Sequence, residues 1–227
     1  MQEEHPWPWP RGRFAEIVYR LDGAGAKVVA FSFDFSKRGE RRNDMAFARA
    51  LKDSRRVVLA AHRQTWEEGD SGEIEIVKFP APEFMIGAAA IGHVLFNVDG
   101  DGIVRHGYRD RRIDAQAVPS LSQAAVAVAL NLDPVPGDVR RFRIDYRRAR
   151  PPIPTISVSD LLEGRFETAD VAGRIVFVGG TAPRFHDVWA TPLGSRQAGI
   201  YLQALAARTL LAEHAAATVS AALKEPS

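Results

Sequence analysis

Three short segments with apolar residues on both faces constrain the fold of this chain more than any other feature. They are Val28–Phe35, Arg56–His62 and Ile175–Val178. A strand that is apolar on both faces has both faces covered, which is typical of parallel strands flanked by helices. The spacing of Phe47, Ala50 and Leu51 predicts a helix between the first two strands, as parallel strand connections require. We therefore predict an α/β fold with a mostly parallel or mixed central sheet and helices on both faces.

Helical and strand patterns alternate along the rest of the chain. A stripe of Phe14, Ile17, Val18 and Leu21 predicts a helix over 13–22. Further helices are predicted from a cap at Asn43 or Asp44, over 83–91, from Pro119, over Ser157–Gly164, and from Gly199 to about Leu223. Alternating apolar residues on either side of a glycine-rich turn predict a β-hairpin over 93–109. We also predict two further strands, a short one near Ile74 and Ile76 and a half-exposed one over Phe142–Tyr146. Two loops complete the prediction, an acidic one over 66–72 and one from Gly180 to about Gly199.

Composition is that of an ordinary globular domain. Of the 227 residues, 46% are hydrophobic and 26% are charged, which excludes a disordered or coiled-coil chain. The absence of cysteine excludes disulfides, thiolate metal sites and cysteine nucleophiles. A formal net charge of +2 implies no general affinity for polyanions, and the arginines over 140–150 are typical of a solvated strand edge. We expect no nucleic-acid partner.

Several enzyme classes lack their sequence signatures here. The chain has no His-Glu-x-x-His motif, no Gly-x-Ser-x-Gly motif and no Gly-Lys pair of a phosphate-binding loop. Gly23-Ala24-Gly25 precedes a strand instead of following one, so it does not fit a dinucleotide-binding turn. We therefore expect that the chain is not itself an enzyme.

Two groups of residues raise the question of a bound metal ion. Asn97-Val98-Asp99-Gly100-Asp101-Gly102 matches the opening of a calcium loop, but the twelfth position is Tyr108 instead of glutamate, which favours a simple hairpin turn. His93, His186 and Asp187 are candidate ligands for a divalent metal, although their spacing fits no standard set. We expect no cofactor, with a metal ion left open.

Asp34 is the strongest single candidate for a binding residue. It lies near the carboxyl end of a predicted parallel strand, where open α/β sheets place their ligand sites. A buried carboxylate without a partner costs several kcal/mol, so Asp34 needs an arginine, a histidine, backbone amides or a ligand. Gly179-Gly180-Thr181 follows another predicted strand, so its backbone can approach the same crevice.

The ordered set of motifs resembles the CHASE type 2 domain, a family of sensory extracellular domains associated with cyclases and histidine kinases. The matching segments are Trp7–Arg11, Gly25–Phe31 with Asp34-Phe35, Asp44 with Ala46–Leu51, Gly92–Val94, Asp99–Arg105, Pro119–Leu121, Ser157–Asp160, Val178–Ala182, Asp187, Thr191-Pro192 and Gly199-Ile200. The resemblance covers about residues 7–212.

This resemblance implies a sensor in a bacterial transmembrane receptor, on the periplasmic face of the inner membrane. Such receptors place one membrane helix before the sensor, several after it, and a cytoplasmic kinase or adenylate or guanylate cyclase module at the end of the chain. We accordingly expect a membrane-proximal segment over 1–12, a single sensor domain over 13–212 and a helical extension over 213–227 toward an absent membrane segment. Trp7 and Trp9 fit either a membrane interface or the core.

The expected stimulus is a small molecule or a protein, and its expected binding residues come from several segments. They are Asp34, Asp99, Asp101, Arg105, Gly179, Gly180, Thr181 and Asp187. Two alternatives stay open. In one, the module dimerises or binds a protein through its terminal helices without a small ligand. In the other, His186, Asp187 and Asp34 form the centre of a metal-dependent hydrolase.

Overall fold

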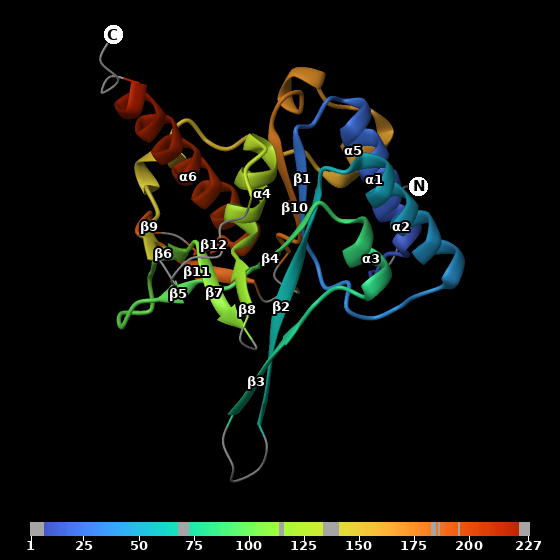
Figure 1. Cartoon of the computed structure of the whole chain (residues 1–227), viewed down its shortest axis with the longest axis horizontal. Helices are drawn as coiled ribbons and strands as arrows, with labels where there is room; N and C mark the ends of the chain where they lie inside the picture. The colour runs from blue at the N-terminus through green and yellow to red at the C-terminus, as the bar shows by residue number, and fades with distance from the viewer. Residues whose placement is uncertain are drawn as a thin grey trace.

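Four parallel strands form the centre of the fold. The computed structural model describes residues 7–67, 73–113, 116–133, 141–182, 185, 187–194 and 196–222, with the backbone alone for 63–67, 73–76 and 222. The strands are β1 (Val28–Ser32), β2 (Val57–Glu67), β4 (Ala90–His93) and β10 (Ile175–Gly179). They pair in the order β10-β1-β2-β4, and β3 (Glu73–Lys78) pairs antiparallel with the outer half of β2. The β2–β3 hairpin projects from the body of the molecule (Figure 1). The predicted α/β class with a mixed sheet is confirmed.

Helices cover both faces of the sheet. On one face lie α1 (Arg11–Gly23), α2 (Arg41–Ser54), α3 (Pro82–Gly87) and α5 (Val158–Glu163); on the other lie α4 (Leu121–Leu130) and α6 (Gly199–Ala222) (Figure 1). Alternation along β1 explains this arrangement, because Val29 and Phe31 pack with α1 and α2 while Val28 and Ala30 pack with α4. The four fully buried positions of β1, Val28 to Phe31, are therefore all apolar, as the sequence pattern indicated.

Capping residues fix where the helices begin, and two of the predicted helix starts differ from the observed ones. Ser157 caps α5 as predicted, with its side chain accepting from the Asp160 amide. The predicted cap at Asn43 or Asp44 is wrong, because α2 begins at Arg41 after Glu40. The predicted start at Pro119 is also wrong, because the Ser120 side chain accepts from the Gln123 amide and α4 begins at Leu121.

The predicted hairpin over 93–109 exists in a shorter form. Strand β5 (Asn97–Val98) pairs antiparallel with β6 (Val104–Tyr108), and β9 (Arg141–Arg143) pairs with the other edge of β6. The half-exposed strand predicted over Phe142–Tyr146 ends early, since Asp145 caps the 3₁₀ helix η2 (Tyr146–Ala149).

Short strands were the elements that prediction missed. Residues 90–93, expected to end a helix and begin a hairpin, form β4 beside β2. The hairpin of β7 (Asp110–Ile113) and β8 (Gln116–Pro119) was not expected, and β11 (Val188–Ala190) pairs with β12 (Arg196–Ala198) inside the predicted loop. These strands have three or four residues each, too few for a periodic pattern, and β4 and β9 pair with segments distant in sequence. The acidic loop predicted over 66–72 is shorter, because β2 includes Trp66 and Glu67, and residues 68–72 lie outside the described part of the chain.

Candidate functional site

A crevice of about 390 Å³ lies where the four parallel strands end. Its lining consists of Trp7, Ser32, Phe33, Asp34, His62, Val94, Leu95, Phe96, Arg111, Gly180, Phe185, Asp187 and Trp189. Segments after β1, β4 and β10 contribute to it, as does β2 at the point where it leaves the parallel sheet. The structure thus brings together three of the predicted site residues, Asp34, Gly180 and Asp187. Their position is the usual ligand position of open α/β sheets.

Asp34 lies just beyond the end of β1 and is exposed. Its Oδ1 accepts a hydrogen bond from the Ser36 amide at 2.8 Å, so the required partner is a backbone amide. Burial raises the pKa of Asp34, but hydrogen bonds from Ser36 and the nearby His62 and Lys78 outweigh that effect. The net pKa is lower than usual, and Asp34 lines the crevice as a carboxylate at neutral pH.

Asp187 links the crevice to the start of α6. Its Oδ1 accepts from Trp189 Nε1 at 2.7 Å, and its backbone carbonyl accepts from the Gly199 amide at 2.9 Å. A Cβ added to Gly199, the first residue of α6, would overlap the Asp187 carboxylate. The carboxylate is therefore packed against the beginning of that helix, where a negative charge is favourable.

His62 lines the crevice together with these two carboxylates, and both of them act on its charge. Burial lowers the pKa of His62, and the opposing effects of Asp34, of a hydrogen bond to the Phe33 backbone and of Asp187 are smaller. The ring is therefore neutral at pH 7. Its Nε2 atom is buried and has no hydrogen-bond partner.

Aromatic rings form much of the remaining lining. The Trp7 ring lies 5.2 Å from the Phe33 ring and 5.0 Å from the Phe185 ring, measured between centroids. Across the crevice lining, Phe96 and Trp189 are 6.0 Å apart. Trp7, which we considered for the membrane interface or the core, lies against these rings with 36% of its surface exposed, and Trp9 packs on the core.

The glycines after β10 serve packing within the protein. A Cβ on Gly179 would overlap Ile200, and one on Gly180 would overlap the Phe185 ring. The absence of side chains at these positions therefore admits Ile200 and Phe185. Gly180 lines the crevice, whereas Gly179 and Thr181 do not.

The hairpin residues Asp99, Asp101 and Arg105 form a separate cluster. Arg105 donates to Asp99 at 3.0 Å and to both carboxylate oxygens of Asp101 at 2.8 and 2.7 Å. These ion pairs hold the pKa of Asp101 at about 2, chiefly through the hydrogen bonds from Arg105. Because the Arg105 guanidinium group already pairs with both carboxylates, these contacts stabilise the segment as a simple hairpin turn. Its residue Ile103 bridges Ala190, so the hairpin supports the segment that carries Trp189.

The candidate metal ligands do not gather in the part of the chain that the structure describes. His93 is fully buried, its Nδ1 accepts from the Leu95 amide at 3.2 Å, and burial lowers its pKa to about 3. His186 lies outside the described residues. No three histidine, aspartate or glutamate side chains among the described residues form a group able to hold a metal ion.

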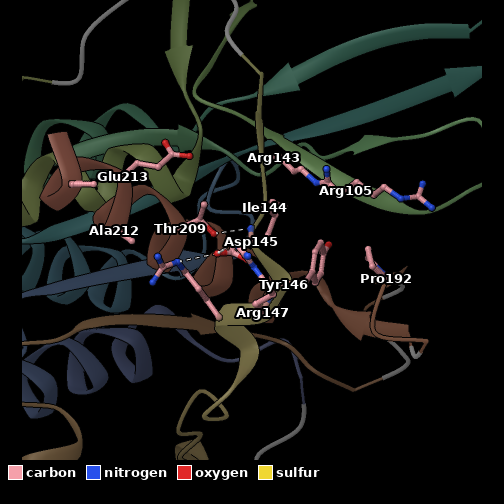
Figure 2. Close-up of a pocket in the computed structure, with 12 residues that line it drawn as sticks. Arg105, Arg143, Ile144, Asp145, Tyr146, Arg147, Pro192, Thr209, Ala212 and Glu213 are labelled. Carbon is pink, nitrogen blue, oxygen red and sulfur yellow. Dashed lines mark hydrogen bonds and ion pairs between the residues drawn. The ribbon is translucent and has the colours of Figure 1, made fainter. Parts of the chain in front are cut away.

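A larger cavity of about 690 Å³ lies along α6 beside β9 and η2 (Figure 2). Arginines dominate its charge, namely Arg105, Arg143, Arg147 and Arg148. The first is paired with the hairpin carboxylates, and the last two pair with Asp145. Figure 2 also shows Thr209 of α6 facing Asp145, whose amide donates to it at 3.1 Å. Because most of these charges are already neutralised, the crevice is the better candidate for a ligand site.

Sequence reasoning missed most of the crevice lining. His62 ends the predicted strand Arg56–His62, so the argument that selected Asp34 would also have selected it. Phe96, Arg111, Phe185 and Trp189 lie on short strands or loops whose placement depends on distant contacts, and no local pattern marks them.

Comparison with known proteins identifies the family. A family model described as the CHASE2 domain matches residues 1–226. The chain belongs to the CHASE2 family. CHASE2 domains are sensory extracellular domains, which supports a sensory role and an extracytoplasmic placement. No curated protein and no solved structure gives a significant match. None of the helices within the described residues combines the length and the apolar character that crossing a bilayer requires.

Proposed function

We propose that this CHASE2 domain is the ligand-sensing part of a bacterial transmembrane receptor and that a small molecule binds in the crevice. The observation that carries the proposal is the convergence of Asp34, His62 and Asp187 with aromatic rings at the carboxyl ends of the parallel strands. The paired hairpin residues Asp99, Asp101 and Arg105 act as a rigid support beside it, and Gly179 and Thr181 shape the end of β10.

The signal leaves the crevice through α6. Asp187 contacts both Trp189 in the lining and Gly199 at the start of the helix. A ligand that binds the Asp187 carboxylate favours one arrangement of α6 over another. The difference in ligand affinity between the two arrangements sets the size of the response.

The parent receptor supplies the remaining parts. In this proposal residues 1–12 and 213–227 lead toward flanking membrane helices at the periplasmic face of the inner membrane, and residues 13–212 form the sensor domain. A cytoplasmic histidine kinase or nucleotide cyclase reads the change in α6.

A thermal-shift screen of the purified chain tests the binding step. The screen adds amino acids, amines, sugars, nucleotides, organic anions and metal ions in turn. A ligand at a concentration about 100 times its Kd stabilises the fold by about 2.7 kcal/mol. We expect at least one compound to raise the melting temperature and Asp34→Ala to abolish that rise. The variant should stay folded, with a slightly lower unliganded melting temperature because the Ser36 amide loses its acceptor. Unchanged ligand protection in Asp34→Ala would remove Asp34 from the site.

Self-association through α6 is a second candidate function. The side chains over 213–221 are all exposed, and this end of α6 extends beyond the body of the molecule (Figure 1). A second copy of the chain could cover that surface. A molecular mass that rises with concentration in sedimentation, without response to any compound, would favour this function over ligand sensing.

A further inference from the structure

The charged and polar groups of the crevice have the chemistry of a site for a protonated amine. Asp34 and Asp187 both line it with carboxylate groups, and Arg111 is the one arginine among the described lining residues. Lys78 and Arg11 lie near Asp34 but outside this lining. With His62 neutral, a cation that enters the crevice meets two carboxylates and one guanidinium group, and both carboxylates attract it.

His62 adds a hydrogen-bond acceptor to the same lining. Its ring is hydrogen-bonded to the Phe33 backbone, and Nε2 has no partner, which leaves Nδ1 as the donor to the Phe33 carbonyl. In a neutral imidazole the second nitrogen is then an acceptor. Nε2 is buried and unpartnered, so a donor from a ligand would satisfy it. A primary ammonium group has three N–H donors, enough for Asp34, Asp187 and His62.

The aromatic lining suits the organic part of such a cation. Trp7, Phe33 and Phe185 form one contiguous group of rings, and Phe96 with Trp189 forms another. Ring faces attract cations, and the rings also bury alkyl or aryl groups. A cavity of about 390 Å³ lies within the usual size range of small-molecule sites.

We propose that the crevice recognises a small organic molecule through a protonated primary amino group held between Asp34 and Asp187. This inference rests on the proposed function. Two sources share this chemistry, namely a simple amine and the amino group of an amino acid. Arg111, whose guanidinium lies 5.1 Å from the Tyr108 ring centroid, would pair with the carboxylate of an amino acid.

Calorimetric titration with matched probes tests the proposal. The probes are 2-phenylethylamine, its uncharged analogue 2-phenylethanol, cadaverine, phenylalanine and 3-phenylpropionate. We expect at least one ammonium compound to bind with Kd below about 10 mM and at least 10-fold more tightly than the alcohol and the carboxylate. The wild-type chain alone decides this comparison, so it does not depend on the folding of any variant.

Variants that remove one negative charge test whether the amine binds in the crevice. Asp34→Asn and Asp187→Asn keep the acceptor oxygens for Ser36 and Trp189, and each is expected to weaken ammonium binding at least 10-fold. Asp53→Asn is the matched control, because it removes the same charge from the exposed end of α2. Binding of phenylalanine that exceeds that of 2-phenylethylamine and is lost in Arg111→Gln identifies an amino acid, and equal binding identifies an amine.

The outcomes separate this inference from the sensor proposal. Equal affinity for 2-phenylethylamine and 2-phenylethanol, or no ammonium probe binding below 10 mM, overturns the amine inference. If a neutral or anionic compound from the broad screen instead binds and loses its protection in Asp34→Ala, the sensor proposal holds and the amine inference alone fails. If no compound protects the chain, both fail.

Discussion

His93 shows at the scale of a single residue how burial fixes a charge state. Burial lowers the pKa of this fully buried side chain to about 3, and the nearby Arg111 acts in the same direction. Between pH 6.5 and 3 the unfolded chain therefore binds a proton at this position that the folded chain does not. His62 is shifted in the same direction by burial. The contribution of these two histidines to the free energy of unfolding is therefore present in full above about pH 6.5 and is lost as the pH is lowered.

We predict that His93 alone reduces the free energy of unfolding by about 2 kcal/mol between pH 7 and pH 5. His93→Asn keeps an acceptor for the Leu95 amide but cannot titrate, so its loss over this range should be smaller by that amount. Urea unfolding at the two pH values measures the difference. Equal losses in the wild type and the variant would contradict the assignment.

Gly92 is a second position where one residue decides packing. A Cβ here would lie 2.6 Å from Leu121 Cα and 2.7 Å from Leu121 N, backbone atoms of α4 that cannot move aside independently. Gly92→Ala should therefore destabilise the fold by about 1–3 kcal/mol, as overpacking does. Gly23→Ala is the control, since a Cβ there meets nothing within 4 Å and its effect should be neutral or stabilising. Chemical unfolding of both variants checks the prediction, and equal effects would exclude the close approach.

At the scale of elements, α4 depends on its cap. It has 10 residues and is buried over most of its surface, and Ser120 supplies a side-chain acceptor for its first turn at 3.1 Å. Ser120→Ala should lower the free energy of unfolding by about 1 kcal/mol. Ser120→Thr should lower it much less, because threonine also supplies a hydroxyl as the capping acceptor. Urea unfolding of the two variants tests this, and equal loss in both would assign the cost to packing instead of capping.

At the scale of the whole molecule, Gln203 joins α6, α4 and the crevice. This side chain is 2% exposed, accepts from the Ser122 hydroxyl of α4 and donates to the Val94 carbonyl at 3.3 Å. Val94 also lines the crevice. The two helices on this face of the sheet are thus tied to the end of β4 by buried polar contacts as well as by apolar packing.

Replacing Gln203 with leucine leaves the Val94 carbonyl without this side-chain donor, while the Ser122 hydroxyl keeps its hydrogen bond to the backbone carbonyl of residue 203 at 3.0 Å. We predict a loss of about 1–3 kcal/mol in Gln203→Leu. In the double variant with Ser122→Ala the cost should be less than the sum of the single costs, because each single substitution already removes the side-chain contact between Ser122 and Gln203. A double-mutant cycle in urea measures this coupling, and strict additivity would show that the contact contributes nothing.

The sequence was sufficient to predict the α/β class, the long helices and the central strands. Those elements carry enough apolar residues at regular spacing that one arrangement buries them, as in Val28–Ser32 of β1. It also selected Asp34 and Gly180, because residues that follow buried strands meet at one edge of a parallel sheet. Asp187 was selected for a different reason, as a candidate metal ligand beside His186 and as part of the family resemblance. The resemblance to the family rested on the same motifs.

Contacts between distant segments determine which of the predicted residues share a site. Arg105 pairs with Asp99 and Asp101 within the hairpin, and none of these three residues lines the crevice. Trp7, His62 and Trp189 enter the lining from segments far apart in the sequence. Short strands such as β4 exist only because a neighbour pairs with them, so local preference cannot predict them. Site composition therefore depends on long-range packing, whereas fold class depends on local periodicity.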